Sequence, residues 1–444
     1  MASYAERRDR LVAALKSGGP APVALGKSTS NLFRERARVA RERLDVRDFD
    51  HVLEVDPARR TIEVEGMTPY GRLVDAALLC GVMPAVVPQL KSITVGGALA
   101  GVGIESSSFR YGLVHDTVQE IEVLTGTGEV VVARPDNEHR DLFLAFPNSY
   151  GTLGYALKVT ALAVPVKPWV RLTHRRFRDA EDYFAALGAA CAGDADFLDG
   201  VFFGPDEFYL CEGRFADAAP YTSDYTYEHI YYRSIRERTE DFLTTRDYLW
   251  RWDTDWFWCS KNLGAQHPLL RRLYGRRRLN SVTYTKMMRW NSRVGLSALV
   301  NRLLRRHTES VIQDVDIPLG HCAEYLDFFQ REIGITPVWI CPIQVWRKEA
   351  RFPLYPLDPD ETYVNFGFWD VVRSSLPHPE GWYNRRIEQE VARLGGIKSL
   401  YSDSYYPRME FDRTYGGTAY REVKRRYDPK GRFRDLYDKC VLRH

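Results

Sequence analysis

Residues 94–112 are rich in small and hydroxylated side chains. Gly96, Gly97, Gly101 and Gly103 fall within eight positions, and three serines follow at 106–108. Glycine permits positive φ and lets the backbone approach a ligand closely. Successive backbone N–H groups in such a bend bind anions, and serine hydroxyls add further donors. The segment therefore predicts a site for a flat ligand that carries a pyrophosphate, although its spacing matches neither the Rossmann turn nor the P-loop.

Several strings of this sequence resemble one known family. Residues 88–97, 103–108 and 111–113 are similar to the flavin-binding domain of the vanillyl-alcohol oxidase superfamily, which has the PCMH-type fold. Within it, the string Gly-Ile-Glu-Ser-Ser-Ser followed by Tyr-Gly resembles the Δ24-sterol reductase (seladin/diminuto) branch. Further matches lie at residues 141–143, 151–154, 338–342 and 400–403, so the resemblance covers most of the chain. A glycine-rich hairpin without a ligand is the alternative interpretation.

The resemblance implies a non-covalently bound FAD. It implicates these residues as cofactor-binding: Thr94, Gly96, Gly97, Gly101, Gly103, Ile104, Glu105, Ser106, Ser107, Ser108, Tyr111, Gly112, Asp116, Gly151, Thr152, Gly154 and Lys424. Superfamily members that link the flavin covalently use a His or Cys, and the motif contains neither. His115 and His51 each fit a structural hydrogen-bonding role as well as a functional one. Residues 26–31 are a candidate pyrophosphate loop or a simple turn.

The C-terminal residues 420–429 resemble the Lys-x-x-x-Asp-Pro element that returns the chain to the flavin domain. The resemblance places Lys424 near the N1/O2 edge of the flavin, where a cation stabilises the anionic reduced ring. Lys424 is favoured over its neighbours because only it has the matching offset from Asp428. Arg425 and Arg426 fit a solvated basic helix face equally well.

Reduction of an unactivated alkene requires a hydride for one carbon and a proton donor for the other. The sequence offers Tyr405, Tyr415, Glu410 and Glu105 as candidate donors, and the family match at 401–403 places the nearby segment close to the flavin. The predicted catalytic set is therefore Lys424, Tyr405, Tyr415 and Glu105. The sequence does not identify the donor among them, because most of the 26 tyrosines are expected to pack in the core.

Length and composition exclude several classes of protein. A chain of 444 residues, with 45% hydrophobic and 27% charged side chains, predicts a soluble protein of two domains. A net charge of +3 argues against nucleic-acid binding. The seven cysteines lack metal-ligand spacing, so no metal is predicted, and their odd number suits a reducing cytoplasm.

The pattern of elements predicts an α+β fold. Residues 1–168 form a two-subdomain PCMH-type FAD-binding domain, 169–400 an α+β cap or substrate domain with an antiparallel sheet, and 401–444 a segment that returns to the first domain. Helices are expected at 4–17, 69–80, 141–146, 179–192, 322–332, 383–395 and 420–427. Strands are expected at 51–56, 61–65, 156–164, 169–175 and 200–212, with a hairpin at 120–133 and a surface loop at 347–362.

Two stretches of the second domain each allow two interpretations. The aromatic residues of 248–258 form either core or an aromatic slot for a lipid. The arginine- and leucine-rich residues 271–306 form either a basic amphipathic surface at a membrane or a cap helix with a solvated face. No apolar run could span a bilayer and no N-terminal signal or anchor is recognisable, so we expect a cytoplasmic protein, peripheral on the inner face of the membrane. Together with its Ala/Arg-rich composition, this suggests a bacterial protein.

The leading hypothesis is an FAD-dependent oxidoreductase that reduces a carbon–carbon double bond in a lipid, with NADPH as electron donor. The substrate is either a methylene-branched fatty acyl chain, which we favour, or a Δ24-sterol-like side chain, and a lipid-modifying enzyme would be a partner. One alternative is a flavin-dependent alcohol or sugar oxidase or dehydrogenase, distinguished by its reaction with oxygen. Another is a non-catalytic flavin-binding partner protein. The sequence leaves the oligomeric state open.

Overall fold

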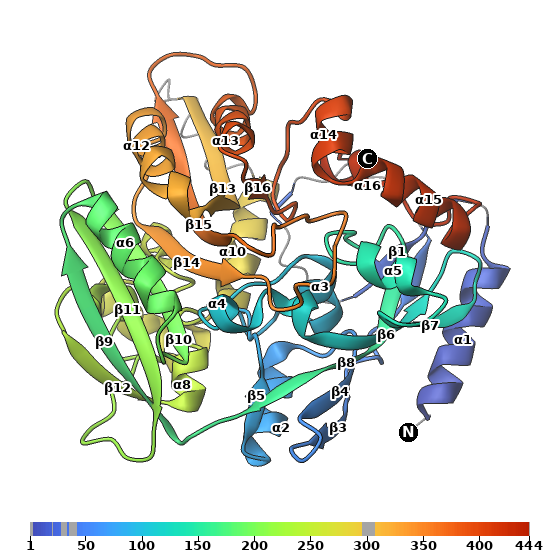
Figure 1. The fold of residues 1–444 in the computed structure, drawn as a ribbon, viewed down its shortest axis with the longest axis horizontal. Helices are drawn as coiled ribbons and strands as arrows, with labels where there is room; N and C mark the ends of the chain where they lie inside the picture. The colour runs from blue at the N-terminus through green and yellow to red at the C-terminus, as the bar shows by residue number, and fades with distance from the viewer. Residues whose placement is uncertain (1–2, 20, 28–32, 35–41, 295–306, 444) are drawn as a thin grey trace.

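The computed structural model describes residues 3–19, 21–27, 33–34, 42–294 and 307–443. Two sheets dominate the molecule, and the C-terminal helices lie over the N-terminal part (Figure 1). Helices and antiparallel sheets together make the predicted α+β fold. The first sheet ends with β8 (Tyr155–Pro165) and the second begins with β9 (Trp169–Phe177), so the predicted boundary at 168 falls between these strands.

The first sheet has the order β3-β4-β8-β6-β7, with β5 added on β8. Its other strands are β3 (Val52–Asp56), β4 (Thr61–Glu65), β5 (Val82–Pro84), β6 (Val118–Leu124) and β7 (Val130–Ala133). The hairpin β6–β7 and strand β8 confirm the strands expected there from alternating apolar residues. The helices of this part are α1 (Tyr4–Ser17), α2 (Tyr70–Leu79), α3 (Val95–Ala100), α4 (Ser108–Tyr111) and α5 (Arg140–Ala145), and β1 (Ala24–Gly26) pairs in parallel with β2 (Arg43–Asp45).

The second sheet has eight strands in the order β12-β9-β11-β10-β14-β15-β13-β16. The remaining strands are β10 (Phe197–Gly204), β11 (Glu207–Ala216), β12 (Glu240–Thr244), β13 (His307–Pro318), β14 (Val338–Gln344), β15 (Thr362–Ser374) and β16 (Ile397–Lys398). The expectation of one strand over 200–212 is wrong, because the chain turns at 205–206 into the hairpin β10–β11. The long strands β13 and β15 have no counterpart in the sequence prediction.

The two faces of the second sheet bury different partners. Leu198, Phe202 and Ile340 belong to a core formed with α6 (Ala180–Cys191), α12 (Cys322–Glu332) and α13 (Trp382–Arg393). Residues of opposite parity, such as Val201 and Trp339, belong to the core that also holds the N-terminal domain. Because strand side chains alternate between faces, any polar residue in the second set points toward the N-terminal domain.

The remaining described α-helices are α7 (Tyr231–Ser234), α8 (Thr245–Leu249), α9 (Pro268–Tyr274), α10 (Ser281–Val294), α14 (Arg408–Thr414), α15 (Gly417–Tyr427) and α16 (Leu436–Cys440). Turns of 3-10 helix lie at Val114–Thr117, Cys259–Leu263, Arg276–Arg278 and Leu319–His321. Helix α15 packs on α5, where the Tyr427 hydroxyl donates to Asp141 at 2.8 Å. The C-terminal segment therefore contacts the N-terminal domain (Figure 1).

Three general features bear on function. Within the described ranges, every helix is too short or too polar to cross a bilayer. The described part of the chain also holds no group of His, Cys, Asp and Glu side chains that could bind a metal ion. All seven cysteines lie in described segments and carry free thiols.

Candidate functional site

The glycine-rich segment begins with helix α3, which packs closely on the first sheet. Thr94 is the N-cap, and its hydroxyl accepts from the Gly97 amide at 3.3 Å. The Gly96 amide donates to the Gly66 carbonyl at 2.8 Å, and a Cβ at Gly96 would lie 2.9 Å from that oxygen. Gly97 alone in this helix is exposed. A ligand could therefore approach the helix backbone at Gly97, while Gly96 serves packing.

The residues after α3 form a compact turn. A Cβ at Gly103 would lie 3.0 Å from both Pro88 and Val114, and Gly112 has φ of 70°. Ile104 is buried, and Tyr111 is half-buried at the end of α4. Tight packing against neighbouring side chains thus fixes the path of this backbone.

The three serines of the motif are buried and bind within the protein. Ser107 donates to the Ala85 carbonyl at 2.7 Å, and Ser108 accepts from the Glu105 amide at 3.2 Å. Ser106 donates to the Glu105 carboxylate and lies 2.9 Å from the Tyr248 hydroxyl. These hydroxyls hold the segment in shape, so contact with a ligand falls to the backbone.

Glu105 belongs to a buried ion network that joins the two domains. The Arg251 guanidinium lies 3.1 Å from Glu105 and 2.7 Å from Asp199 of β10, and the Trp339 indole donates to Asp199 at 3.1 Å. Burial raises the pKa of Glu105, and Arg251 acts in the opposite direction. Both carboxylate oxygens of Glu105 are engaged, by Arg251 and by Ser106. The proton-donor role of Glu105 stays a prediction, and the network gives this residue a structural role.

His115 and Asp116 are buried just after the motif. The Leu113 amide donates to Asp116 at 3.0 Å, which orders the turn. Burial raises the pKa of Asp116 to about 7 and lowers the pKa of His115 to about 3. The His115 ring packs edge-on against Phe352, with ring centroids 4.4 Å apart. His115 is therefore a neutral imidazole held in an apolar setting.

The segment 148–154 concentrates unusual backbone conformations. Asn148, Tyr150, Gly151 and Gly154 have φ values of 61°, 50°, 75° and 154°. A Cβ at Gly154 would lie 2.9 Å from the Leu124 carbonyl, and the Tyr150 ring lies 3.4 Å from the Cβ position of Gly101. Such conformations persist only where the surroundings enforce them, and they cluster at binding sites. This turn therefore joins Gly101 and the predicted residues Gly151, Thr152 and Gly154 in one place.

Lys424 ties the C-terminal segment to this turn. Its ammonium lies 2.7 Å from the Thr152 carbonyl, 2.6 Å from the Asp428 carboxylate and 2.7 Å from the Phe433 carbonyl. Burial lowers the pKa of Lys424, and the Asp428 carboxylate opposes that shift. The Arg434 carbonyl is a fourth acceptor at 3.2 Å, so protein atoms engage all three ammonium hydrogens. The predicted contact with a flavin edge is untested, and the geometry shows a cross-link between distant segments.

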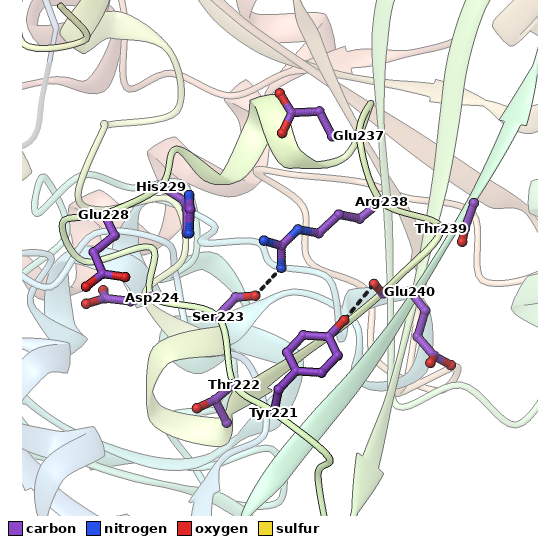
Figure 2. A pocket seen from close by; sticks show the side chains of 10 residues that line it. All are labelled: Tyr221, Thr222, Ser223, Asp224, Glu228, His229, Glu237, Arg238, Thr239 and Glu240. Carbon is purple, nitrogen blue, oxygen red and sulfur yellow. Dashed lines mark hydrogen bonds between the residues drawn. The ribbon is translucent and has the colours of Figure 1, made fainter. Parts of the chain in front are cut away.

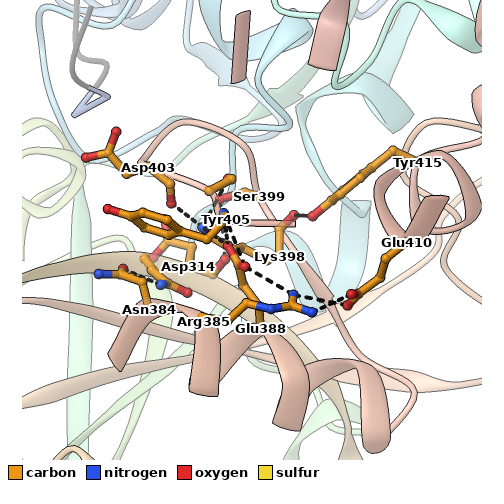
Figure 3. Close-up of polar contacts among 12 residues, drawn as sticks. Asp314, Asn384, Arg385, Glu388, Lys398, Ser399, Asp403, Tyr405, Glu410 and Tyr415 are labelled. Carbon is orange, nitrogen blue, oxygen red and sulfur yellow. Dashed lines mark hydrogen bonds and ion pairs between the residues drawn. The ribbon is translucent and has the colours of Figure 1, made fainter. Parts of the chain in front are cut away.

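Tyr405, Tyr415 and Glu410 lie around a buried ion pair (Figure 3). Lys398 and Glu388, both fully buried, are 3.0 Å apart. The Tyr415 hydroxyl donates to the Lys398 carbonyl at 2.8 Å, and the Tyr405 amide donates to Glu388 at 3.0 Å. Glu410 pairs with Arg385. The structure thus gathers these three candidates around one ion pair in the C-terminal half of the chain.

Polar residues that the sequence analysis did not single out lie between the two domains. Asp314 and Asp316 of β13 are joined there by Asn365 of β15, Tyr355 of the 345–361 loop and Tyr401. Tyr150 of the strained turn interacts electrostatically with Asp314 and Tyr401. Alternation of polar and apolar residues over 314–317 is the signal that could have revealed the polar face of this strand.

Aromatic side chains continue from this polar cluster. Trp369 lies with its ring centroid 4.3 Å from Phe257, and Phe257 lies 4.6 Å from Trp252. Phe33 stacks on Trp256 at 5.4 Å. The aromatic side chains Trp252, Trp256, Phe257 and Trp258 are buried in the core that also holds the N-terminal domain, as the core interpretation of this stretch expects. This cluster, called the aromatic wall below, meets the polar cluster through Trp369.

Two open pockets lie elsewhere, and no sequence-predicted site residue lines either. One, of about 500 Å³, is bounded by residues 221–224, 228–229 and 237–240 (Figure 2). Its side chains include Asp224, Glu228 and Glu237, and Arg238 within it donates to Ser223. The other, of about 480 Å³, lies over β6 and β7 and is lined by Arg134, Arg140 and Arg347 among others. Their charged linings do not suit a lipid.

Comparison with known proteins identifies the class. The FAD binding domain family matches residues 6–134. With the α+β architecture and the glycine-rich turn, this match indicates an FAD-dependent oxidoreductase whose N-terminal part is an FAD binding domain.

Its relatives extend over nearly the whole chain. Δ24-sterol reductase from Arabidopsis thaliana is 26% identical over 432 residues, covering 89% of this chain and 76% of the relative. Δ24-sterol reductase from Homo sapiens is 27% identical over 404 residues, covering 87% and 75%. Cytokinin dehydrogenase 10 from Oryza sativa subsp. japonica is 29% identical over 127 residues, covering 28% and 23%. The predicted resemblance to the Δ24-sterol reductases is confirmed by these similarities.

The residues at the domain interface fit FAD. The exposed Gly97 and the strained turn at 148–154 offer backbone to a flat ligand, and Ser149 Oγ and Asn148 Oδ1 are buried with no hydrogen-bond partner among the described residues. Such buried polar atoms are rare unless a ligand or water satisfies them. The candidate pyrophosphate loop at 26–31 lies partly outside the described residues, since residues 28–31 are not described.

Proposed function

We propose that this chain is an FAD-dependent reductase of a carbon–carbon double bond in a lipid. The observation that carries the proposal is the similarity to Δ24-sterol reductases over nearly nine-tenths of the chain, cap domain included. Cytokinin dehydrogenase 10, by contrast, matches only 28% of this chain. Because substrate is selected in the cap, a relationship that includes the cap supports shared chemistry.

The interface between the domains suits this reaction. FAD, when bound, supplies a two-electron hydride carrier. The aromatic wall would pack against an apolar chain. The β13 carboxyl Asp314 is connected to this wall through Tyr401 and Trp369. We propose a methylene-branched fatty acyl chain as substrate, with a Δ24-sterol-like side chain as the alternative, and NADPH as the electron donor.

A surface at α9 supports access from a membrane. Leu269, Leu270 and Leu273 are 68%, 43% and 75% exposed. Arg272 beside them and Arg276–Arg278 just after them are also exposed. Exposed apolar side chains flanked by cations suit an anionic lipid surface. Arg271 does not belong to this surface, because it is buried and pairs with Asp255 at 2.7 Å. The rest of the basic stretch, 295–306, lies outside the described residues.

One anaerobic experiment tests the proposal. The purified protein is expected to show an oxidised flavin spectrum that NADPH bleaches. Addition of a methylene-branched phospholipid should restore it, and restoration by a Δ24-sterol alone would instead identify a sterol substrate. Bleaching by an alcohol but not by NADPH would indicate an oxidase. A colourless protein that takes up no FAD would overturn the assignment.

A further inference from the structure

Strand β13 carries two carboxyls that face the N-terminal domain. Asp314 and Asp316 are two residues apart and so share one face of the sheet. The register places Asp314 opposite Gly367 of β15 and Gly367 opposite Trp339 of β14. Trp339 belongs to the core that contains the N-terminal domain. Both carboxyls therefore point to the side where the FAD-binding residues lie.

The two carboxyls differ in their partners. Asp316 is 1% exposed and accepts from Asn365 and from the Tyr355 hydroxyl, both at 2.7 Å. Asp314 is partly buried, and its Oδ1 is a buried atom without a hydrogen-bond partner in the described part of the chain. The absence of a side chain at Gly367 accommodates this oxygen, since a Cβ there would lie 2.7 Å from it. Asp314 is thus the carboxyl whose oxygen still needs a hydrogen-bonding partner, which a bound ligand would supply.

A chain of hydrogen bonds orients Asp314. The Trp369 indole donates to the Tyr401 hydroxyl at 2.9 Å, and that hydroxyl bonds to the Asp314 carboxyl. Because the Tyr401 oxygen accepts from Trp369, its own hydrogen is free to point toward Asp314. Trp369 also packs on Phe257 of the aromatic wall. Asp314 is therefore connected to the aromatic wall through Tyr401 and Trp369.

The segment that carries Tyr401 is fixed at both ends. The Ser399 amide donates to the Asp314 carbonyl at 3.0 Å, and the Phe33 amide donates to the Tyr401 carbonyl at 3.0 Å. The buried Lys398 ammonium lies 3.0 Å from Glu388 and bonds to the Asp403 carbonyl (Figure 3). Tyr401 consequently has little freedom to leave Asp314.

The surroundings favour the acid form of Asp314. Burial, and after it the neighbouring Asp316, raises the pKa of Asp314 well above its usual range, and the bond from Tyr401 acts in the opposite direction. Burial raises the pKa of Asp316 to about 6. The titratable groups that face Asp314 are Asp316 on its own strand, Tyr401, Tyr150 from the strained turn and Tyr355 from the 345–361 loop. These surroundings therefore favour the protonated form of Asp314.

We propose that Asp314 is the proton donor of the reduction and that Tyr401 and Trp369 are its positioning residues. This inference rests on the proposed function. One alkene carbon receives a hydride from the reduced flavin, and the other forms a C–H bond with the proton of Asp314 as the π bond breaks. The flavin is left oxidised and Asp314 is left as a carboxylate, which regains a proton from water.

The first test is infrared spectroscopy of the protein without flavin at neutral pH. Wild type is expected to show the carbonyl stretch of a protonated carboxyl group, and Asp314→Asn should remove the Asp314 part of that band. This measurement needs no turnover, and an unchanged band in the variant would overturn the inference.

The second test separates proton transfer from flavin chemistry. Flavin is reduced with dithionite, and its reoxidation is followed by stopped-flow with a methylene-branched phospholipid, with a Δ24-sterol or with a quinone, which forms no C–H bond. Asp314→Asn should slow reoxidation by the alkene about 10²–10⁴-fold and leave the quinone reaction near wild type. Equal alkene rates in variant and wild type would overturn the inference. A wild-type enzyme that no alkene reoxidises would instead overturn the proposed function.

Two neighbouring variants should shift the pH profile of the alkene reaction in opposite directions. Asp316→Asn removes a charge that raises the pKa of Asp314, so the loss of rate should begin at lower pH. Tyr401→Phe removes a bond that lowers that pKa, so the loss should begin at higher pH, with a lower maximal rate from poorer positioning. If Asp316 and Tyr401 had only structural roles, neither variant would change the pH at which the rate begins to fall. A shift of that pH in the same direction in both variants would also contradict the proposal.

Discussion

At the scale of single residues, most polar groups of the glycine-rich segment stabilise the protein itself. The serine hydroxyls, the Glu105 carboxylate and the Lys424 ammonium all bind protein atoms. Buried polar groups need such partners, and leaving one without a partner costs about 1–3 kcal/mol. An unpartnered carboxyl oxygen such as that of Asp314 is therefore more informative than a residue in a recognisable motif.

His115 should make stability depend on pH. Burial lowers its pKa to about 3, so the unfolded chain, with an ordinary histidine pKa near 6.5, binds the extra proton. The contribution of His115 to stability is full above about pH 6.5 and falls as the pH drops, by about 2 kcal/mol between pH 7 and pH 5. His115→Gln should lose less stability over this interval in urea titrations. An equal loss in variant and wild type would show that His115 is not held neutral.

Gly154 should not tolerate a side chain. Its φ is 154°, and a Cβ would lie 2.5 Å from Val123 Cγ1 and 2.9 Å from the Leu124 carbonyl. We expect Gly154→Ala to lower the free energy of unfolding by about 2–4 kcal/mol, through steric overlap and backbone strain. Gly204→Ala, where a Cβ meets nothing within 4 Å, is the control and should change it by less than about 1 kcal/mol. Equal effects in the two variants would contradict the packing argument.

At the scale of elements, one side of helix α9 binds the rest of the domain, and the other side exposes apolar side chains to solvent. Arg271 binds Asp255 and the Tyr227 carbonyl and so fixes the helix to the domain. The opposite side carries the exposed Leu269 and Leu273. Neighbours along one helix thus have opposite roles, which clustering of arginines in sequence does not reveal.

Leu273→Asp should weaken binding to anionic vesicles. The substitution removes exposed apolar surface and adds a charge that anionic lipid repels, so we expect at least about a tenfold loss in a sedimentation assay. Leu79→Asp is the matched control, because Leu79 is 90% exposed on α2 with no comparable arginine cluster beside it in sequence. Equal binding by the Leu273 variant and wild type would exclude this surface.

At the scale of the whole molecule, the two domains share one core. Residues of the first sheet and the inner face of the second belong to a single apolar cluster. The Glu105–Arg251–Asp199 network crosses the same boundary. The site between the domains therefore has fixed walls, and Asp314 faces the flavin-binding segments without a large movement.

Arg251→Met should destabilise the whole chain. It leaves Glu105 and Asp199 buried without their cation, a loss of about 3–5 kcal/mol. Arg175→Met, which breaks the half-exposed pair with Glu212, is the control and should cost less than about 1 kcal/mol. The melting temperature and the amount of bound flavin would be measured for both variants. Similar melting temperatures for the two would show that the network is not stabilising.

The sequence by itself determined the class of fold, the presence of an FAD binding domain and most of the longer helices. Helix α1 and the hairpin β6–β7 follow from local periodicity and turn residues, which act over a few neighbouring positions. The family strings, likewise, are local. Sequence reasoning could therefore place Gly97 and Gly101 in a binding segment, yet it could not assign a donor among distant tyrosines and carboxyls.

Only the tertiary structure decided which polar groups meet. Asp314, Trp369 and Tyr401 come from β13, β15 and the loop after β16, and strand register alone brings them together. Register depends on pairings between residues far apart in the chain, which no local pattern encodes. The assembled fold also places Glu105 beside Arg251 and leaves one oxygen of Asp314 without a hydrogen-bond partner. Burial among those partners, a property of the assembled fold, then set the protonation state of each carboxyl.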